Sequence, residues 1–372
     1  MIGIKVKKFI KAAKFNKHAM ICLGAGSSQI SVIAKAKSLG YTVVAIDQNR
    51  EAHGFKHADF KIYQSTYDAD IIIKELETLK DKFKWIGVLN RSSGPPVITA
   101  AKICKHFNLP GVPIDSARKL VNKDKMRTAC RKQNIPSVKY KIYDIDKCNT
   151  IEIDKLPVVT KPALSLIGKS GVSVVRSKNK IKLSIKYAIK NTINKKILIE
   201  EFLNGPDLSF ISFVNQGQLF PICLLEEINI ENKNGTLSPK GYKTHDSDTY
   251  NWMQQAHDIA KKIILKFNIE RSPLAISLRP DAKNNLKLIE VHLDMGGDLL
   301  IEAFYPKALT FDYLKFAVDI TTSNFKHPID FKIKPTAIYY NEGSGLLSDR
   351  DYKIFTANTM QILDEKILKA KL

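Results

Sequence analysis

Residues 156–175 have the sequence LPVVTKPALSLIGKSGVSVV, and this stretch carries the first signal of the fold. A β-rich run comes first, Lys161 follows it directly, and a second β-rich run occupies residues 172–175. The loop between the two runs holds Gly168, Ser170 and Gly171. Small residues let backbone N–H groups approach an anion, and a lysine at a strand end adds a fixed positive charge. The stretch predicts a flap over a polyphosphate, although an ordinary glycine-containing hairpin has the same composition.

The composition describes a globular protein of two or three domains. The chain has 372 residues, of which 44% are hydrophobic and 26% are charged. No window approaches the apolar length of a membrane span. The five cysteines show no CxxC pair and no metal-ligand spacing. We therefore expect a reducing, cytoplasmic compartment without a disulfide framework.

The net charge of +22 is spread over the whole chain. A nucleic-acid-binding protein is one interpretation, but the lysines are mixed with acids and few aromatic residues lie among them. We expect no specific nucleic acid partner. The first acidic residue is Asp47, so residues 1–18 contain lysines but no acid. A helix on an anionic membrane surface is one interpretation of this segment. A presequence is another, but it would use arginine. We expect a packed or frayed extension instead.

Strands and helices alternate from residue 20 to residue 115. Short apolar runs near residues 20–23, 41–47, 60–63 and 85–90 alternate with helical patterns, which predicts a parallel sheet. Ligands of such sheets bind at the carboxyl ends of the strands, where residues 24–29, Asp47 and residues 90–94 would meet. A dinucleotide site is the alternative, but Gln29 occupies the position of its third glycine.

The central part of the chain offers three further sites. The pattern of residues 116–133 predicts one helix, which carries Lys123 and Lys125. The polar composition of residues 229–250 predicts a mobile loop. A strand breaks at Glu200 and Glu201 and resumes after Asp207, which would free backbone groups for a planar heterocycle. Extended structure would place Glu290 and His292 on one face, where they can bind a divalent cation, although Mg²⁺ prefers oxygen ligands. The tail predicts one strand, at residues 336–340, and one helix.

Taken in order, these motifs resemble the ATP-grasp superfamily, in its carboxylate–amine ligase branch, over roughly residues 20–320. The resemblance implies an α/β (α+β) ATP-grasp fold with an N-terminal Rossmann-like domain. The implied boundaries are a basic extension (1–19), the N-terminal domain (20–115), a small lobe with the flap (116–198), a large lobe (199–325) and a C-terminal segment (326–372).

The resemblance also implies a site for ATP with Mg²⁺ or Mn²⁺. KDKM resembles the family's Asp-Lys pair, which makes Lys125 a phosphate contact, and IEEFLNGPDLS resembles the adenine hinge, with Asp207 on the ribose. The implied nucleotide contacts are Lys125, Lys161, Gly168, Ser170, Gly171, Glu200, Glu201, Phe202, Leu203 and Asp207. The implied metal ligands are Glu290 and His292.

The metal strand departs from the family pattern Glu-x-Asn-x-Arg-x-Gly-Gly. His292 replaces the asparagine, Asp294 replaces the arginine, and Ser277 replaces an acidic ligand on the preceding strand. Either Asp281, Asp294 or Asp298 compensates, or metal binding is weakened.

The function implied is an ATP-dependent ligase that activates a small carboxylic acid as an acyl phosphate for attack by an amine. Lys161, Lys240 and Lys243 are the catalytic candidates, the last two on the predicted mobile loop. The substrate candidates are Ser27, Ser28, Asn90, Arg91, Ser92, Ser93, Gly296 and Gly297. A non-catalytic ATP-binding protein with a degenerate metal site is the alternative, and the sequence does not decide between a monomer and a homodimer.

Overall fold

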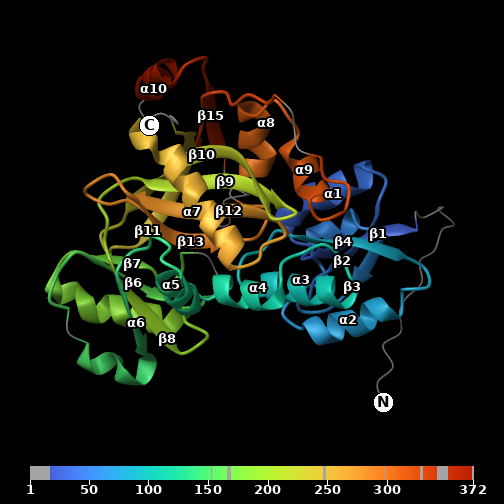
Figure 1. Ribbon diagram of the computed structural model, residues 1–372, viewed down its shortest axis with the longest axis horizontal. Coiled ribbons are helices and arrows are strands. Elements are labelled where there is room, and N and C mark those ends of the chain that lie inside the picture. Colours follow the sequence, from blue (N-terminus) through green and yellow to red (C-terminus); the bar gives the residue numbers. More distant parts are fainter. Residues whose placement is uncertain are drawn as a thin grey trace.

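Three β-sheets organise the chain in a computed structural model (Figure 1). It describes residues 17–151, 153–165, 169–245, 249–297, 299–326, 330–341 and 351–370. Residues 1–16 and Gly168 therefore lie outside the described residues, as does Asp298. In the described part of the chain, no helix has the length and apolar character needed to cross a membrane.

The N-terminal sheet is parallel throughout, as predicted, with strand order β3-β2-β1-β4. Its strands are β1 (His18–Leu23), β2 (Thr42–Ile46), β3 (Phe60–Ile62) and β4 (Lys84–Asn90), and its helices are α1 (Ile30–Ser38), α2 (Ala69–Glu77) and α3 (Pro95–His106), with the short turns η1 (Ser27–Gln29) and η2 (His53–Lys56). Residues 19–23 are at most 1% exposed, because alternate side chains enter cores on opposite faces of the sheet.

Two helices connect this sheet to the rest of the chain, where the sequence predicted one (Figure 1). They are α4 (Ile114–Val121) and α5 (Lys123–Lys132). The single-helix prediction was wrong because Asn122 is extended, with φ −90° and ψ 114°. The new helix start at Lys123 changes which lysine faces inward.

The small sheet is antiparallel and has the order β5-β8-β6-β7. Its elements are β5 (Tyr140–Asp144), η3 (Ile145–Thr150), β6 (Val158–Pro162), β7 (Ser173–Val175), η4 (Lys178–Lys180), α6 (Ile181–Asn191) and β8 (Lys196–Glu201). The two β-rich runs that open the sequence argument are β6 and β7, and they pair as an antiparallel hairpin.

The large sheet has the order β13-β12-β9-β10-β11-β14-β15. Its strands are β9 (Asp207–Asn215), β10 (Gln218–Glu231), β11 (Leu237–Thr244), β12 (Arg271–Pro280), β13 (Leu286–His292), β14 (Thr336–Tyr340) and β15 (Tyr352–Thr356). The other elements of this region are η5 (Thr249–Asn251), α7 (Trp252–Lys266), the π-helical η6 (Leu300–Phe304), α8 (Tyr305–Ala308), α9 (Tyr313–Asp319) and α10 (Met360–Lys369).

Two sequence predictions in this region were wrong. Residues 229–250 were expected to form a mobile loop, but β11 occupies most of their centre and pairs with both β10 and β14. The polar residues of the strand are mostly half-buried, while Gly241 and Tyr242 are buried. The tail contains β15 as well as the predicted β14, and the two strands pair along their length.

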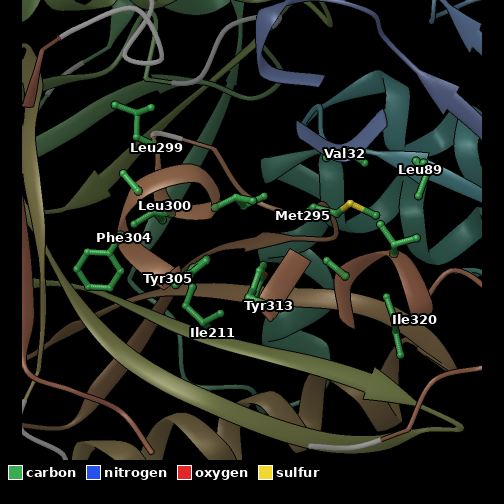
Figure 2. Close-up of a cluster of buried hydrophobic side chains, with 14 of the residues drawn as sticks. Val32, Leu89, Ile211, Met295, Leu299, Leu300, Phe304, Tyr305, Tyr313 and Ile320 are labelled. Atoms are coloured by element: carbon green, nitrogen blue, oxygen red, sulfur yellow. The ribbon is translucent and has the colours of Figure 1, made fainter. Parts of the chain in front are cut away.

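One hydrophobic core joins the N-terminal sheet to the large sheet (Figure 2). Val32 and Leu89 come from the N-terminal side, and Ile211 comes from β9. Figure 2 shows Tyr305 and Tyr313 close to Ile211, with Leu300 nearby. The ring centroids of Tyr305 and Tyr313 lie 4.2 Å apart. This shared core holds the two sheets together on one side of a cleft.

Candidate functional site

A cleft of about 800 Å³ opens between the three sheets. Its walls contain Lys161 from β6, Glu200 from β8, Asp207 from β9 and Glu290 from β13. The end of β4 contributes Arg91. The segments that meet here are separated by up to about two hundred residues, so the cleft exists only in the folded chain.

A buried ion-pair network forms the floor of the cleft. Glu200 is 3% exposed and accepts two hydrogen bonds from Arg127, at 2.7 and 3.1 Å, and one from Lys161 Nζ at 2.7 Å. Arg127 is completely buried and also donates to the carbonyls of Leu288 (3.0 Å) and Ile289 (2.9 Å). Burial alone would raise the pKa of Glu200, but Arg127 and Lys161 lower it below its ordinary value.

Glu290 is the half-buried end of this network. Its carboxylate lies 3.6 Å from Lys123 Nζ, 3.9 Å from Lys161 Nζ and 3.8 Å from His292 Nε2. Burial opposes its ionisation, but the positive charges of Lys123 and Lys161 lower its pKa to about 2. Lys123, Arg127 and Lys161 outnumber the two carboxylates, so the floor carries excess positive charge and suits a polyanion.

The lysine of the KDKM motif that enters the cleft is Lys123, whereas Lys125 was predicted. Lys125 is exposed and does not line the cleft. The reason is helical periodicity: positions 123 and 127 share a face of α5, while position 125 points the other way. The spacing of four between Lys123 and Arg127 was the signal that could have identified both residues.

The flap approaches the cleft through Lys169 and Ser170. Lys169, which the sequence argument missed, forms an ion pair with Glu227 and donates to Asn229 Oδ1 at 2.9 Å. Gly171 does not line the cleft; its role is to allow a turn. It has φ +79°, and a Cβ atom there would lie 2.8 Å from the Asn191 side chain. Gly168 belongs to the residues that are not described.

The predicted hinge residues Glu201, Phe202 and Leu203 line the cleft beside Glu200. The Phe202 ring has the guanidinium of Arg176 at 4.6 Å and that of Arg279 at 4.9 Å, both measured to the ring centroid. Glu201 accepts a hydrogen bond from the Lys139 amide at 2.7 Å. The region therefore offers the cleft an apolar surface at Phe202 and Leu203, with charged side chains beside it.

Asp207 lines the cleft but already has protein partners. Arg279 donates to both of its carboxylate oxygens, at 2.5 and 2.7 Å, and Asn229 donates to one of them at 3.0 Å. Arg279 also donates to the Leu203 carbonyl at 2.7 Å, which ties the hinge to β12. A ribose would have to share Asp207 with Arg279, a residue that the sequence argument did not single out.

The predicted metal ligands Glu290 and His292 both face the cleft. Ser277 pairs directly with Glu290 across β12 and β13, so it occupies the place where a second carboxylate would help. Asp281 does not compensate, because it accepts hydrogen bonds within its own turn outside the cleft. Within the described residues, no group of three or more His, Cys, Asp or Glu side chains could hold a metal ion.

The predicted substrate residues separate into two groups. Arg91, Ser93, Gly296 and Gly297 line the cleft; Ser27, Ser28, Asn90 and Ser92 do not. Asn90 instead shapes the loop after β4, since its amide donates to the Ser92 carbonyl at 2.9 Å.

Arg91 joins several segments of the chain where it lines the cleft. It forms a two-point ion pair with Glu302 and donates to the Gly296 carbonyl at 2.8 Å. It also donates to the Ser28 carbonyl, so Ser28 contributes its backbone rather than its hydroxyl. Arg91 therefore links the N-terminal sheet to the loop after β13.

Lys240 and Lys243 were predicted as catalytic residues on a mobile loop, and the structure places them elsewhere. Both belong to β11, and neither lines the cleft. Lys243 pairs with Asp364 of α10 at 3.1 Å. The β11 residues that do line the cleft are Leu237, Pro239 and Tyr242.

Comparisons with known proteins agree with this architecture. No protein-family model matches the chain. Over 203 residues, 51% of this chain and 49% of the relative, it is 30% identical to a formate-dependent phosphoribosylglycinamide formyltransferase of Prochlorococcus marinus. The chain thus spans about half the length of the curated relatives it matches.

Solved structures match over nearly the whole chain. A phosphoribosylglycinamide synthetase from Anaerococcus prevotii has a TM-score of 0.71 at 17% identity, covering 95% of this chain and 97% of that one. An N5-carboxyaminoimidazole synthetase from Staphylococcus aureus, complexed with ADP, has a TM-score of 0.74 at 14% identity, covering 97% and 98%. The chain therefore has the fold of these proteins, and the order of its motifs resembles that of the ATP-grasp superfamily.

Proposed function

We propose that the chain is an ATP-dependent ligase that joins a small carboxylic acid to an amine. The observation that carries the proposal is the floor of the cleft, where Lys123 and Lys161 flank an ionised Glu290. Excess positive charge around one cleft-facing carboxylate suits a triphosphate with its metal ion. The ADP complex of a structural neighbour supports a nucleotide in a cleft of this fold.

Residues of the cleft would divide the binding of ATP between them. Phe202 and Leu203 offer an apolar wall to the base, and Lys123 and Lys161 offer charge to the phosphates. Lys240 and Lys243 have no part in this proposal. Glu290 fits the metal of Mg·ATP, because Mg²⁺ in nucleotide sites is usually held by one or two carboxylates together with phosphates. There the ion would neutralise phosphate charge, and His292 is not a preferred ligand for it.

The proposed reaction has two displacements. A substrate carboxylate oxygen attacks the γ-phosphorus, the bond from that phosphorus to the bridging oxygen breaks, and ADP leaves. The amine nitrogen then attacks the acyl carbon, the carbon–oxygen bond to phosphate breaks, and the nitrogen loses a proton as the amide forms. The protein supplies position and electrostatic stabilisation rather than a covalent group.

A phosphate-release assay with Mg·ATP and pooled small carboxylic acids and amines tests this function. We expect release that requires both an acid and an amine. Glu290→Gln should lower turnover about a hundredfold or more, since it removes the carboxylate that would hold the metal ion at the reacting phosphates. Glu270→Gln, the same change at an exposed residue outside the cleft, should leave turnover unaltered. ATP binding without release under any combination would refute the ligase and favour the non-catalytic ATP-binding protein.

A further inference from the structure

Beside the hinge, a row of polar side chains joins β9 and β12 to the flap. Glu227 and Asn229 lie two residues apart on β10, and both line the cleft. The register pairs Glu227 with Asp207 of β9, so two carboxylates face each other across the sheet. Like charges in that position repel. Lys169 of the flap compensates Glu227, and Arg279 of β12 compensates Asp207, so the row holds an ion pair at each end.

Asn229 is the neutral group between these two ion pairs. Its Oδ1 accepts a hydrogen bond from Lys169 Nζ at 2.9 Å, and its Nδ2 donates to Asp207 Oδ2 at 3.0 Å. An amide suits this place because it offers an acceptor to the cation and a donor to the carboxylate. The β10–β11 register shifts between Ile228 and Asn229, and such irregularities re-aim a side chain. Asn229 therefore links the flap to Asp207.

The end of β10 is also attached to the small lobe. Arg176, which follows β7, forms a two-point ion pair with Glu231, with N–O distances of 2.8 and 3.0 Å. The Val174 amide of β7 donates to the carbonyl of Gly235, in the turn between β10 and β11, at 2.8 Å. Strand β10 thus reaches from the large sheet to the small lobe. These contacts fix its backbone beside the flap, so Asn229 has a fixed place from which to hold a flap side chain.

We propose that Asn229 is a positioning residue that couples binding of the nucleoside half of ATP to closure of the flap. This inference rests on the proposed function, in which the base lies against Phe202 and Leu203. A carboxylate accepts about four hydrogen bonds. Asp207 already receives three, two from Arg279 and one from Asn229. A ribose hydroxyl can supply the fourth and fix the orientation of the carboxylate.

The fixed carboxylate would hold the Asn229 amide with its oxygen toward Lys169, which keeps the flap closed over the phosphates. By linkage, a closed flap would strengthen nucleoside binding by the same factor, so the two halves of ATP bind cooperatively. A bridge of two hydrogen bonds to charged groups shifts such an equilibrium by about tenfold. Without Asn229, each half of the nucleotide would bind independently of the other.

Hydrogen exchange of the full chain, measured by mass spectrometry on the flap peptides that contain Lys169, tests the proposal. Calorimetric titration with Mg·AMP-PNP comes first, and failure to bind it refutes the proposed function itself. The probe for exchange is adenosine, which has no phosphate to contact the lysines. At saturating adenosine, we expect exchange in the flap of the wild type to slow by at least about threefold. If Mg·AMP-PNP binds but adenosine fails to bind or leaves flap exchange unchanged, the proposal is overturned.

Two substitutions separate the two hydrogen bonds of Asn229. Asn229→Ala removes both, so flap exchange without ligand should rise about tenfold and the response to adenosine should disappear. Asn229→Asp keeps an acceptor for Lys169 but repels Asp207. Its flap exchange without ligand should therefore stay within about twofold of the wild type, while the response to adenosine disappears.

A purely structural role of Asn229 would not separate these two measurements. The matched control is Asn179→Ala, at an exposed position of the small lobe outside the cleft, and it should change neither of them. Each variant is compared at adenosine concentrations that saturate it in calorimetry. A response to adenosine that persists in Asn229→Ala or in Asn229→Asp would contradict the role of Asn229. The measurement of the adenosine response in the wild type needs no variant.

Discussion

Removal of Arg127 tests the buried network that forms the floor of the cleft. Arg127→Met keeps the volume but deletes two hydrogen bonds to Glu200 and two to the carbonyls of Leu288 and Ile289. Breaking a buried ion pair by removing one partner costs about 3–5 kcal/mol. Because Lys161 still pairs with Glu200 at 2.7 Å, we expect a loss near the lower limit, about 3 kcal/mol.

Urea denaturation, monitored by circular dichroism, measures the loss of stability as a change in the free energy of unfolding. The control is Arg131→Met, one turn further along α5, where the side chain is exposed and lies over the Tyr140 ring at 5.6 Å. Its expected cost is below about 1 kcal/mol. Arg127→Lys keeps the charge without the two-point geometry and should fall between the two. If Arg127→Met and Arg131→Met unfold at the same urea concentration, the network around Glu200 does not stabilise the fold.

Three further predictions concern the charge on Glu290, the flap and the choice of lysine. The folded-state pKa of Glu290, about 2, lies below its ordinary value of 4.5, so its contribution to stability is present above pH 4.5 and disappears as the pH falls toward 2. The difference in urea midpoint between wild type and Glu290→Gln should therefore shrink between pH 6 and pH 3.5. A difference that stays constant over this range would contradict the lowered pKa. Gly171→Ala should lower the free energy of unfolding by about 1–3 kcal/mol more than Gly217→Ala in the same denaturation assay. Both glycines have positive φ, but only at Gly171 would the new Cβ atom clash. Equal losses would show that the flap can relax around the added atom. Lys123→Ala should weaken Mg·AMP-PNP binding about tenfold to a hundredfold in calorimetry, whereas Lys125→Ala should weaken it less than about twofold. The reverse order would favour Lys125 as the phosphate contact, as the KDKM motif predicted.

The parts of the fold that have strong periodicity could be predicted from the sequence. The N-terminal strands are short apolar runs covered on both faces, and such runs identify a parallel sheet without any knowledge of the partner strands. The β6–β7 hairpin and the break between β8 and β9 follow equally from local composition. The domain boundaries drawn at residues 19, 115, 198 and 325 stay predictions.

The rest depends on contacts that a linear pattern does not contain. Strand β11 was expected to be a loop because its residues are polar, yet its pairing with β10 and β14 satisfies its backbone. Lys125 was chosen over Lys123 because KDKM resembles the family's Asp-Lys pair, and the break at Asn122 that starts a new helix at Lys123 was not predicted. Arg127 looks like a surface arginine in the sequence, and its burial becomes apparent only when Glu200 is placed beside it. For β11 and for Arg127, a deciding partner lies far away along the chain.

The structure of the chain in complex with Mg·AMP-PNP tests the central claim most directly. We expect electron density for the triphosphate within hydrogen-bonding distance of the Lys123 and Lys161 ammonium groups, and for the metal ion beside Glu290. A nucleotide bound instead at the turn after β1, between Gly24 and Gln29, would contradict the assignment of the cleft and return the N-terminal sheet to the role of a dinucleotide site.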